Sequence, residues 1–417
     1  MEESFSTMHA IFVSDIHRGH GHVFGMRFAS FAEVLARRGH RIIYLSPTKS
    51  ASDDGDTPDG LRLRLATHDW AQPMHVAVQG RPHAPTELLR SGRLPSPLRR
   101  ALTAGLMLGR GGVHSEFPDG AAPLIPILAD EFKPHAVWAV FGNTSSLVLG
   151  QTIARRAGTG WVMDLKDNWQ SYVPPGLRWA MARRFRDATS FTTNAELHAA
   201  AATPWVTQRH RVVYSGMAPE MIAAADSRPR GDEFQIMLMG SIYYDDRMLA
   251  FLAAINAWLQ RLPPEQRLRV TFRYAGNAAA QVAALLTREP LACVTMATPN
   301  VPLAELGPLC QASAVNCYIW NTTTFHHKML ELCACRRPII AFPGEHAESI
   351  AIAKAVGGGL NPCADTADVV AALDRIYADW ASGRGFIAET RLDSVGWDAM
   401  AAKLEAALLE AAAAKRS

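Results

Sequence analysis

The sequence predicts an α/β fold made of two doubly wound, Rossmann-like domains. Short apolar runs, typical of buried strands, alternate with longer segments of helical periodicity, and the whole alternation occurs twice along the chain. Between the two series, residues 215–233 lose the apolar pattern and contain Pro219, Pro229 and Gly231, as linkers do. The chain of 417 residues is too long for one ordinary domain and has the composition of a globular protein.

The first series begins with an apolar run at residues 9–13, which predicts a strand. A loop rich in glycine and histidine follows, and then a periodic stretch at 24–38 that predicts a helix. Gly39 ends this helix, and residues 41–45 form the next strand. Later in this half we expect strands at 136–141, 160–165, 190–193 and 212–214, and helices at 146–157 and 177–187.

The second series repeats this order from residue 234. A strand at 234–239 ends at Gly240, and a helix follows at 247–262. Residues 268–275 predict a strand and 278–287 a helix. Further strands are expected at 293–296, 314–319 and 338–341, and further helices at 303–312 and 326–334.

These patterns place the domain boundaries. We expect an N-terminal domain at 1–215, a linker at 216–232, a second domain at 233–385 and a C-terminal helical segment at 386–417. Residues 397–415 are rich in alanine, a strong helix former. Periodicity alone does not say where this last helix packs.

Composition excludes several classes of protein. Residues 1–8 contain two acids instead of a basic stretch before an apolar run, so we do not expect them to form a secretory signal. No run reaches the roughly 20 apolar residues of a membrane-spanning helix, and we expect a cytoplasmic protein. The six cysteines are expected to be reduced core thiols, and the spacing of Cys333 and Cys335 is too short for a usual zinc site.

Positive charge is concentrated in one segment of the chain. The net charge of +3 is too small to indicate nucleic-acid binding, but residues 81–113 contain six arginines and one acid, Glu87. Apolar residues lie between the arginines, especially in 98–108. One interpretation is a basic amphipathic helix in peripheral contact with anionic lipid at the inner membrane face. The other is a solvated arginine face beside a substrate cleft.

The glycine after the strand at 234–239 is the first candidate for ligand binding. Open parallel sheets bind ligands beyond the carboxyl ends of their strands. Gly240 and Ser241 lie there, where a turn without a Cβ lets backbone amides approach a phosphate at a helix N-terminus. Arg247 can add a bidentate guanidinium contact to a phosphate oxygen.

Residues 321–338 carry a second candidate. Lys328 and Glu331 are three residues apart and therefore lie on one face of a helix that follows a buried strand. A lysine provides a point charge for a diphosphate, and a carboxylate accepts hydrogen bonds from both ribose hydroxyls. His326 and His327 either reach the sugar or phosphate or serve packing.

The order of these motifs resembles the donor domain of GT-B glycosyltransferases, nearest to the large retaining clan called family four. The pattern in the second half consists of Gly240, Arg247, Val301-Pro302, Glu305-Leu306, Lys328, Glu331 and Arg337-Pro338. The first half resembles the acceptor domain and hinge of that clan in Arg38-Gly39-His40 with Ile42, DLKDNW at 164–169, residues 192–196 and VVYSG at 212–216.

The resemblance implies roles for individual residues. Glu331 matches the carboxylate that holds the donor ribose, and Val301 lies beside the base. The diphosphate positions are matched by the amides of Gly240 and Ser241 with the side chains of Arg247 and Lys328. The amides of Gly21 and His22 match the glycine loop near the donor phosphate and the acceptor.

The sequence departs from the clan at two places. Many members have a second glutamate eight residues before the ribose-binding one, where this chain has Thr323. Many also have a His-Asp pair after the strand at 160–165, where this chain has Lys166-Asp167. These departures leave the contacts to the reacting sugar open.

The loop DIHRGHGHVFG contains His17, His20 and His22. No acid or cysteine at a usual ligand spacing completes a metal site with them, so a histidine near the acceptor hydroxyl is the favoured interpretation. Asp15 and Asp167 are rival general bases.

Together, these features predict transfer of a sugar from a nucleotide diphosphate sugar to an acceptor hydroxyl or amine in the interdomain cleft. The resemblance implies retention of anomeric configuration, and the cations make a metal or other cofactor unnecessary. Arg247, Lys328, His22 and Asp167 are the expected catalytic residues. His327 is an additional donor contact, and His20, Gly21, His22, Lys166 and Trp169 are the expected acceptor or cleft residues. A nucleotide-sugar epimerase and a noncatalytic scaffold are the alternatives.

Overall fold

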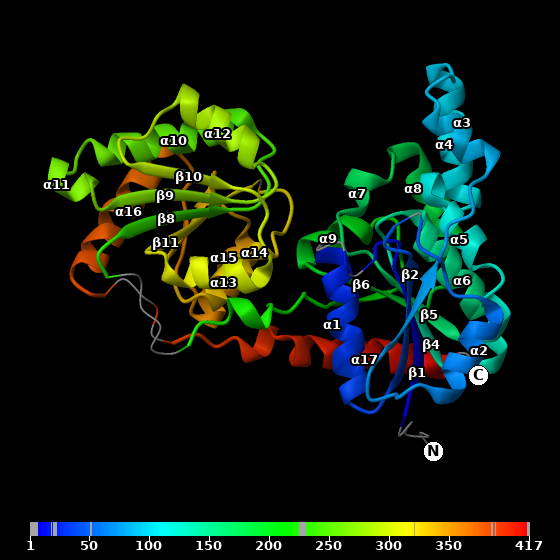
Figure 1. Cartoon of the computed structure of the whole chain (residues 1–417). Coiled ribbons are helices and arrows are strands. Elements are labelled where there is room, and N and C mark those ends of the chain that lie inside the picture. Colours follow the sequence, from blue (N-terminus) through cyan, green and yellow to red (C-terminus); the bar gives the residue numbers. More distant parts are fainter. Residues whose placement is uncertain are drawn as a thin grey trace. The chain divides into compact units, whose positions relative to one another are not determined.

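A computed structural model describes residues 7–17, 19, 23–50, 52–224, 231–320, 322–384, 387 and 389–414 (Figure 1). The chain divides into two compact units. Unit 1 comprises Met1–Ser215 and Trp397–Ser417, and unit 2 comprises Gly216–Gly396. The C-terminal helix therefore belongs to the same unit as the first half of the chain.

The described part of unit 1 contains a seven-stranded parallel sheet in the order β3-β2-β1-β4-β5-β6-β7. The chain runs outward from β1 to β3 and then returns to the other side of β1 with β4, which makes a topological switch point between β1 and β4. The strands are β1 (His9–Val13), β2 (Arg41–Pro47), β3 (Met74–Val78), β4 (Ala136–Val140), β5 (Gly160–Asp164), β6 (Ser190–Thr193) and β7 (Arg209–Val212).

Helices cover both faces of this sheet because its central strands are apolar on both sides. One face packs Phe12 and Trp138 against α1 and α17, and the other packs Ile11 and Val13 against a core that includes α6. The helices are α1 (Val23–Arg37), α2 (Pro58–Thr67), α3 (Ala84–Arg90), α4 (Ser96–Gly109), α5 (Glu116–Ala121), α6 (Thr144–Ala157), α7 (Trp169–Tyr172), α8 (Pro175–Arg184), α9 (Glu196–Ala202) and α17 (Trp397–Ala414).

The position of α17 depends on a glycine at the start of β5. A Cβ at Gly160 would collide with the carbonyl oxygen of Ala411, so the absence of a side chain allows α17 to approach the sheet closely. Buried Met400, Leu404 and Leu408 line the face of α17 that packs against α1 and the sheet. The C-terminal helix is thus a structural layer of unit 1.

The described part of unit 2 contains a six-stranded parallel sheet in the order β10-β9-β8-β11-β12-β13. Its switch point lies between β8 and β11. The strands are β8 (Phe234–Met239), β9 (Val270–Ala275), β10 (Val294–Thr298), β11 (Val315–Ile319), β12 (Ile339–Phe342) and β13 (Leu360–Pro362).

The helices of unit 2 also lie on both faces of the sheet, with α10, α12 and α16 on one face and α13, α14 and α15 on the other (Figure 1). They are α10 (Asp245–Leu259), α11 (Pro264–Arg267), α12 (Ala279–Arg288), α13 (Leu303–Ala312), α14 (Lys328–Ala334), α15 (Ala347–Val356) and α16 (Thr366–Ala381). Short helical turns lie at Gly112–His114, Ile127–Glu131, Pro219–Met221 and Asp393–Val395. The predicted fold class, two doubly wound α/β domains, is confirmed.

Three further observations on the described residues concern membrane-spanning helices, cysteines and metal sites. None of their helices is long and apolar enough to cross a membrane. The six cysteines are free thiols, five of them buried. No group of three histidine, cysteine, aspartate or glutamate side chains in this part of the chain is arranged to hold a metal ion.

Candidate functional site

Gly240 and Lys328 meet at the switch point of unit 2. Gly240 follows β8 with a φ of 101°, a conformation that favours glycine. Lys328 begins α14, which follows the neighbouring strand β11, and a Cβ on Gly240 would collide with the Nζ of Lys328. The lysine ammonium therefore lies directly beside the turn, where a sheet of this kind binds its ligand.

The turn itself is held by a tyrosine on the next strand. The hydroxyl of Tyr274 donates to the carbonyl oxygen of Gly240 and accepts a hydrogen bond of 3.0 Å from the amide of Ala278. A Cβ on Gly276 would collide with this hydroxyl. The loops after β8 and β9 are thus fixed to each other, which keeps the Gly240 turn in one conformation.

Lys328 and Glu331 form a pair of opposite charge, in which the lysine is half-buried and the glutamate is buried. Burial lowers the pKa of Lys328, an effect that the nearby carboxylate of Glu331 opposes. Burial raises the pKa of Glu331 to about 7, although the lysine favours its charged form. The site thus contains a cation and an acid that ionises near neutrality, both available to a ligand of complementary charge and hydrogen bonding.

Arg247 lies on α10 at the same edge of the sheet. Its Nη1 donates a 2.7 Å hydrogen bond to the carbonyl oxygen of Trp320, just beyond β11, and its guanidinium lies 4.2 Å from the centre of the Tyr244 ring. This hydrogen bond uses one part of the guanidinium fork. The structure therefore places Arg247 beside the carboxyl end of β11, as a second cation at this edge.

The two histidines before α14 have different surroundings. The ring of His326 packs against Trp320 at 4.1 Å and Tyr318 at 5.1 Å, and its Nδ1 accepts a 3.3 Å hydrogen bond from the amide of Lys328. Burial and the neighbouring cations lower the pKa of His326 well below its ordinary value. His327 has its Nε2 3.7 Å from the Glu331 carboxylate. His326 thus supports the start of α14, and His327 adjoins the candidate ribose-binding acid.

The remaining predicted donor residues lie on the same edge of unit 2. Ser241 comes directly after Gly240, and Val301 lies in the loop between β10 and α13, two strands away from β8. Thr323 is exposed in the loop between β11 and α14.

One acid in this region was missed by the sequence analysis. Glu345 follows β12, and it accepts hydrogen bonds from the hydroxyl of Tyr318 and, at 2.7 Å, from the amide of His346. Burial raises the pKa of Glu345. Its position after a buried strand was the available signal, but the hydroxyl that it binds comes from a different strand.

Replacing Gly240 by alanine is expected to weaken binding of a nucleoside diphosphate about tenfold or more, because the new Cβ displaces the Lys328 ammonium. The positive φ adds a loss of about 1–3 kcal/mol in stability. Gly39→Ala is the control, because Gly39 has a φ of 89° but no neighbouring atom within 4 Å of the position that a Cβ would take. Calorimetric titration and denaturant unfolding separate the two effects. Equal affinity in Gly240→Ala and the wild type would contradict the proposed contact.

The switch point of unit 1 also contains a buried acid. Asp15 follows β1 and accepts a 3.0 Å hydrogen bond from the Nδ2 of Asn143, which follows β4. Burial raises the pKa of Asp15, and the hydrogen bond from Asn143 opposes this effect. The sequence analysis considered Asp15 as a base but missed its partner, since the pair is 128 residues apart.

The predicted acceptor residues Lys166 and Trp169, which follow β5, have different surroundings. Lys166 is buried, with its Nζ 3.5 Å from the carboxylate of Asp167, and burial lowers the pKa of this lysine. Trp169 is only 1% exposed and packs against Phe141 with ring centres 5.5 Å apart. The indole of Trp169 therefore belongs to the core of unit 1, because α7 turns it inward.

The histidine loop is described only in part. His20, Gly21 and His22 lie outside the described residues. The Nδ1 of His17 accepts a 2.9 Å hydrogen bond from the amide of Gly19. The roles predicted for His20, Gly21 and His22 stay predictions.

Arg27 and Asp164 form a fully buried ion pair beneath the carboxyl edge of unit 1. The Nε and Nη2 of Arg27 donate to the two carboxylate oxygens of Asp164 at 3.0 and 3.1 Å. Thr192 donates to the same carboxylate at 2.7 Å, and the carbonyl oxygen of Val213 accepts from Arg27 at 2.8 Å. The pair links α1, β5 and β6 to the segment after β7, and so positions the loop 165–169.

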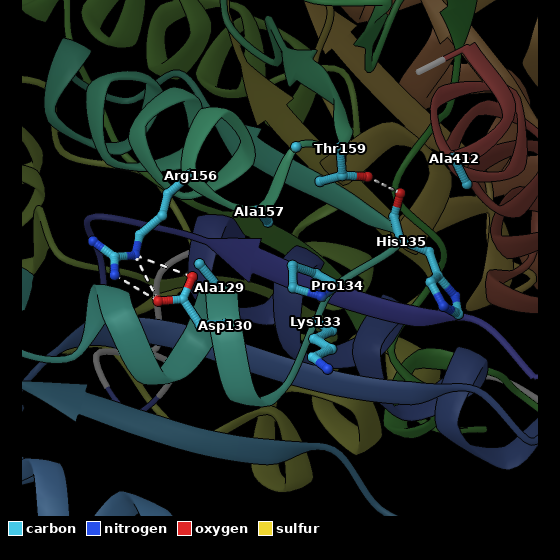
Figure 2. Close-up of a pocket in the computed structure, with 10 residues that line it drawn as sticks. Ala129, Asp130, Lys133, Pro134, His135, Arg156, Ala157, Thr159 and Ala412 are labelled. Carbon is cyan, nitrogen blue, oxygen red and sulfur yellow. Dashed lines mark hydrogen bonds and ion pairs between the residues drawn. The ribbon is translucent and has the colours of Figure 1, made fainter. Parts of the chain in front are cut away.

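A hollow of about 480 Å³ lies at the opposite edge of the unit 1 sheet, at the amino ends of β4 and β5 (Figure 2). Its most prominent charged groups, Arg156 and Asp130, face each other and form an ion pair of 2.5 Å. The hydroxyl of Thr159 donates to the carbonyl oxygen of His135. Since these groups satisfy one another and lie away from the carboxyl ends of the strands, this hollow is a weaker candidate for the functional site.

Comparison with solved structures identifies the fold. No protein-family model matches the sequence, and the search of curated proteins returns no match. Among solved structures, sucrose-phosphate synthase from Thermosynechococcus elongatus matches with a TM-score of 0.65 at 14% identity, over 96% of this chain and 98% of that one. The α,α-trehalose 6-phosphate synthase from Burkholderia multivorans has a TM-score of 0.64 at 12% identity, over 99% and 100% of the two chains.

A third match is the trehalose-6-phosphate structure from E. coli bound with UDP-2-fluoro glucose, with a TM-score of 0.60 at 12% identity over 96% of this chain and 99% of that one. At these identities the likeness shows the fold, which is GT-B. The fold predicted by the sequence motifs is thus confirmed over nearly the whole chain.

Proposed function

We propose that the protein is a glycosyltransferase that moves a sugar from a nucleotide diphosphate sugar to an acceptor hydroxyl or amine. The observation that carries this proposal is the Lys328 ammonium beside the Gly240 turn, at the switch point of unit 2, with Glu331 on the same helix. A cation beside a glycine turn suits a diphosphate, and a buried carboxylate one helical turn away suits a ribose diol. The GT-B fold and two of the matching solved structures, which are named as synthases of sucrose phosphate and of trehalose 6-phosphate, support the same interpretation.

In this proposal the chain mainly stabilises the leaving diphosphate. The bond between the anomeric carbon and the diphosphate breaks, the acceptor forms the new bond to that carbon, and its proton passes to a base. Lys328, Arg247 and the amides of Gly240 and Ser241 stabilise the charge that develops on the phosphate oxygens. With these cations in place, we propose transfer without a metal and with retention of configuration. Asp167 and His22 are the candidate bases.

The donor is proposed to be a uridine or guanosine diphosphate sugar. One structural neighbour is bound with UDP-2-fluoro glucose, which supports the uridine form. Val301, in the loop before α13, is the candidate contact to the base, and Glu331 is the candidate contact to the ribose.

Affinity for a nucleotide sugar is expected to rise from about pH 6 to pH 8, because Glu331 has a pKa raised to about 7. Below this pKa the acid is protonated and offers the ribose a weaker acceptor, whereas above it the carboxylate accepts both hydroxyls. A nucleotide sugar is the suitable ligand because its diphosphate diester does not titrate in this range. Calorimetry at several pH values is the measurement.

Two controls make this pH prediction specific. Glu331→Gln should bind more weakly and with little pH dependence, and a dideoxyribose analogue should remove the dependence from the wild type. A pH profile in Glu331→Gln as steep as that of the wild type would show that another group is responsible.

An assay of product formation tests the proposed function. The protein is incubated with uridine and guanosine diphosphate sugars, with and without a panel of sugar, sugar-phosphate and lipid acceptors, and the products are separated by chromatography. Release of nucleoside diphosphate together with a glycosylated acceptor supports transfer. Conversion of the donor sugar into its epimer would favour the epimerase, and binding without any turnover would favour the scaffold.

A further inference from the structure

An apolar groove in unit 1 is separate from the residues proposed to bind the donor. It has a volume of about 690 Å³ and lies between α4 and the segment containing α7 and α8. Leu89, Met107, Tyr172 and Leu177 supply apolar surface, and Arg99 and Arg100 line it with them. This size is within the roughly 300–1000 Å³ of small-molecule sites, which are mostly apolar with a few polar groups.

On the two longer helices beside this groove, α4 and α8, the charges have one sign, whereas α3, which supplies Leu89, contains Glu87 and Arg90. Helices α4 and α8 contact each other and together contain five arginines and no acid. Within the segment 81–113, Arg90 is paired with Glu116 at 2.6 Å and Arg110 approaches Asp119 at 3.7 Å. Arg99 and Arg100 are exposed and have no acidic partner in the described part of the chain. Of the four arginines in this segment without an acidic partner among the described residues, Arg81, Arg93, Arg99 and Arg100, the last two line the groove.

Two of the three arginines of α8 donate hydrogen bonds to backbone carbonyl groups of neighbouring helices. Arg184 donates to the carbonyl oxygen of Leu108, and Arg178 donates to that of Val173 at 2.9 Å. These bonds attach α8 to α4 and to the end of α7, and so hold the two walls of the groove together. Large apolar side chains remain exposed nearby: Tyr172, which lines the groove, is 55% exposed, and Leu98, next to Arg99, is 59% exposed.

The groove lies at the ligand-binding edge of unit 1. Its walls begin beyond the carboxyl ends of two strands, since α3 and α4 follow β3, and α7 and α8 follow β5 (Figure 1). Apolar surface with unneutralised arginines is complementary to an amphiphile that carries a negative charge next to a chain. A small polar sugar phosphate would fit the arginines but would leave the apolar walls exposed to water.

We propose that this groove is a docking site for anionic lipid at a membrane surface, with the lipid chain in the groove and the headgroup phosphate at Arg99 and Arg100. The site holds the protein at the surface without a membrane-spanning helix. It is independent of the donor site, and a failure of nucleotide binding would leave it unaffected.

Co-sedimentation of the full chain with vesicles tests the proposal. Vesicles of phosphatidylcholine alone are compared with vesicles of phosphatidylcholine and phosphatidylglycerol. The wild type should bind only the anionic vesicles. A basic residue near an anionic surface contributes about fivefold to binding, so the double variant Arg99→Gln/Arg100→Gln should bind about thirtyfold more weakly. The matched control Arg37→Gln/Arg288→Gln removes two exposed arginines elsewhere and should bind almost as the wild type does.

A second pair of variants tests the groove without changing the charge. Ala104 lines the groove, and Ala104→Trp fills it, so binding should fall about tenfold. Ala101→Trp adds the same side chain at an exposed position of α4 and should not reduce binding. Thermal unfolding of each variant shows that the fold is kept.

Several outcomes would overturn the proposal. They are equal binding to both kinds of vesicle or to neither, and equal losses in the Arg37/Arg288 control. Unchanged binding in Ala104→Trp would show that the protein binds vesicles through surface charge and not through the groove. Groove-dependent binding of a short-chain phosphate ester without vesicle binding would identify a soluble ligand, and a dimer lost in Ala104→Trp would identify a second copy of this chain.

Discussion

Replacing Lys328 by alanine is expected to lower the rate of sugar transfer by about 100- to 1000-fold, the usual loss when a preorganised charge-stabilising group is removed from a transition state. The effect is large because the half-buried ammonium is held beside the Gly240 turn, where solvent screens it less than it screens an exposed lysine. The measurement is the steady-state rate of nucleoside diphosphate release at saturating donor.

The control for this substitution is Lys354→Ala, which removes an exposed lysine from the last turn of α15 in the same unit. The control should keep full activity, and circular dichroism should show that both variants are folded at the assay temperature. If Lys328→Ala keeps more than about a tenth of the wild-type rate, the leaving diphosphate is not stabilised by this residue.

Replacing Arg27 by methionine is expected to reduce the free energy of unfolding by about 3–5 kcal/mol, because it leaves the buried carboxylate of Asp164 without its counter-charge. Thr192 still donates to Asp164, but a single hydroxyl does not replace a guanidinium that donates to both oxygens. Denaturant unfolding followed by circular dichroism measures the change.

Two further variants make the stability prediction specific. Arg37→Met, at an exposed position on the same helix α1, should change stability by less than about 0.5 kcal/mol. Arg27→Met/Asp164→Leu should recover a large part of the loss, since no unpaired charge is left in the core. If Arg27→Met loses no more free energy of unfolding than Arg37→Met, the ion pair does not contribute to the stability of the fold.

The central strands of both sheets could be predicted from the sequence because they are apolar on both faces. The strands β1, β4, β5, β8 and β11 all lie in predominantly apolar stretches, and nearly all of their residues are buried. Strand β3 was missed: it lies at an edge of its sheet, and its burial alternates between buried and half-buried residues. Strand β13, also at an edge, is only three residues long and ends in a proline. Edge strands carry a weaker hydrophobic signal, since one side of each lacks a neighbouring strand.

The candidate site could also be predicted only in part. Gly240, Lys328 and Glu331 could be proposed from local signals, namely a glycine after a strand and two charges at the start of a helix. The contact between Lys328 and Gly240 joins residues 88 positions apart in the chain and depends on β8 and β11 being neighbours. Sheet order is not visible in local periodicity. The same reason explains why Asn143 and Glu345 were missed.

The helix lengths also limited the prediction of side-chain direction. Trp169 was expected among the acceptor or cleft residues because it is the last residue of the DLKDNW motif, but α7 begins at this residue and its ring packs into the core against Phe141. Asn168 caps that short helix by accepting a hydrogen bond from the amide of Gln170 at 3.0 Å. A four-residue helix is too short to leave a periodic signal in the sequence, so the burial of this side chain could not be predicted from periodicity.

Calorimetric titration of the wild type and Lys328→Ala with uridine, guanosine, adenosine and thymidine diphosphates tests the central claim most directly. The account predicts that at least one of these nucleotides binds the wild type at one site per chain, and that Lys328→Ala weakens this binding at least about tenfold. If none of the four binds, or if the bound nucleotide has the same affinity for both proteins, the donor site at Gly240 and Lys328 is contradicted.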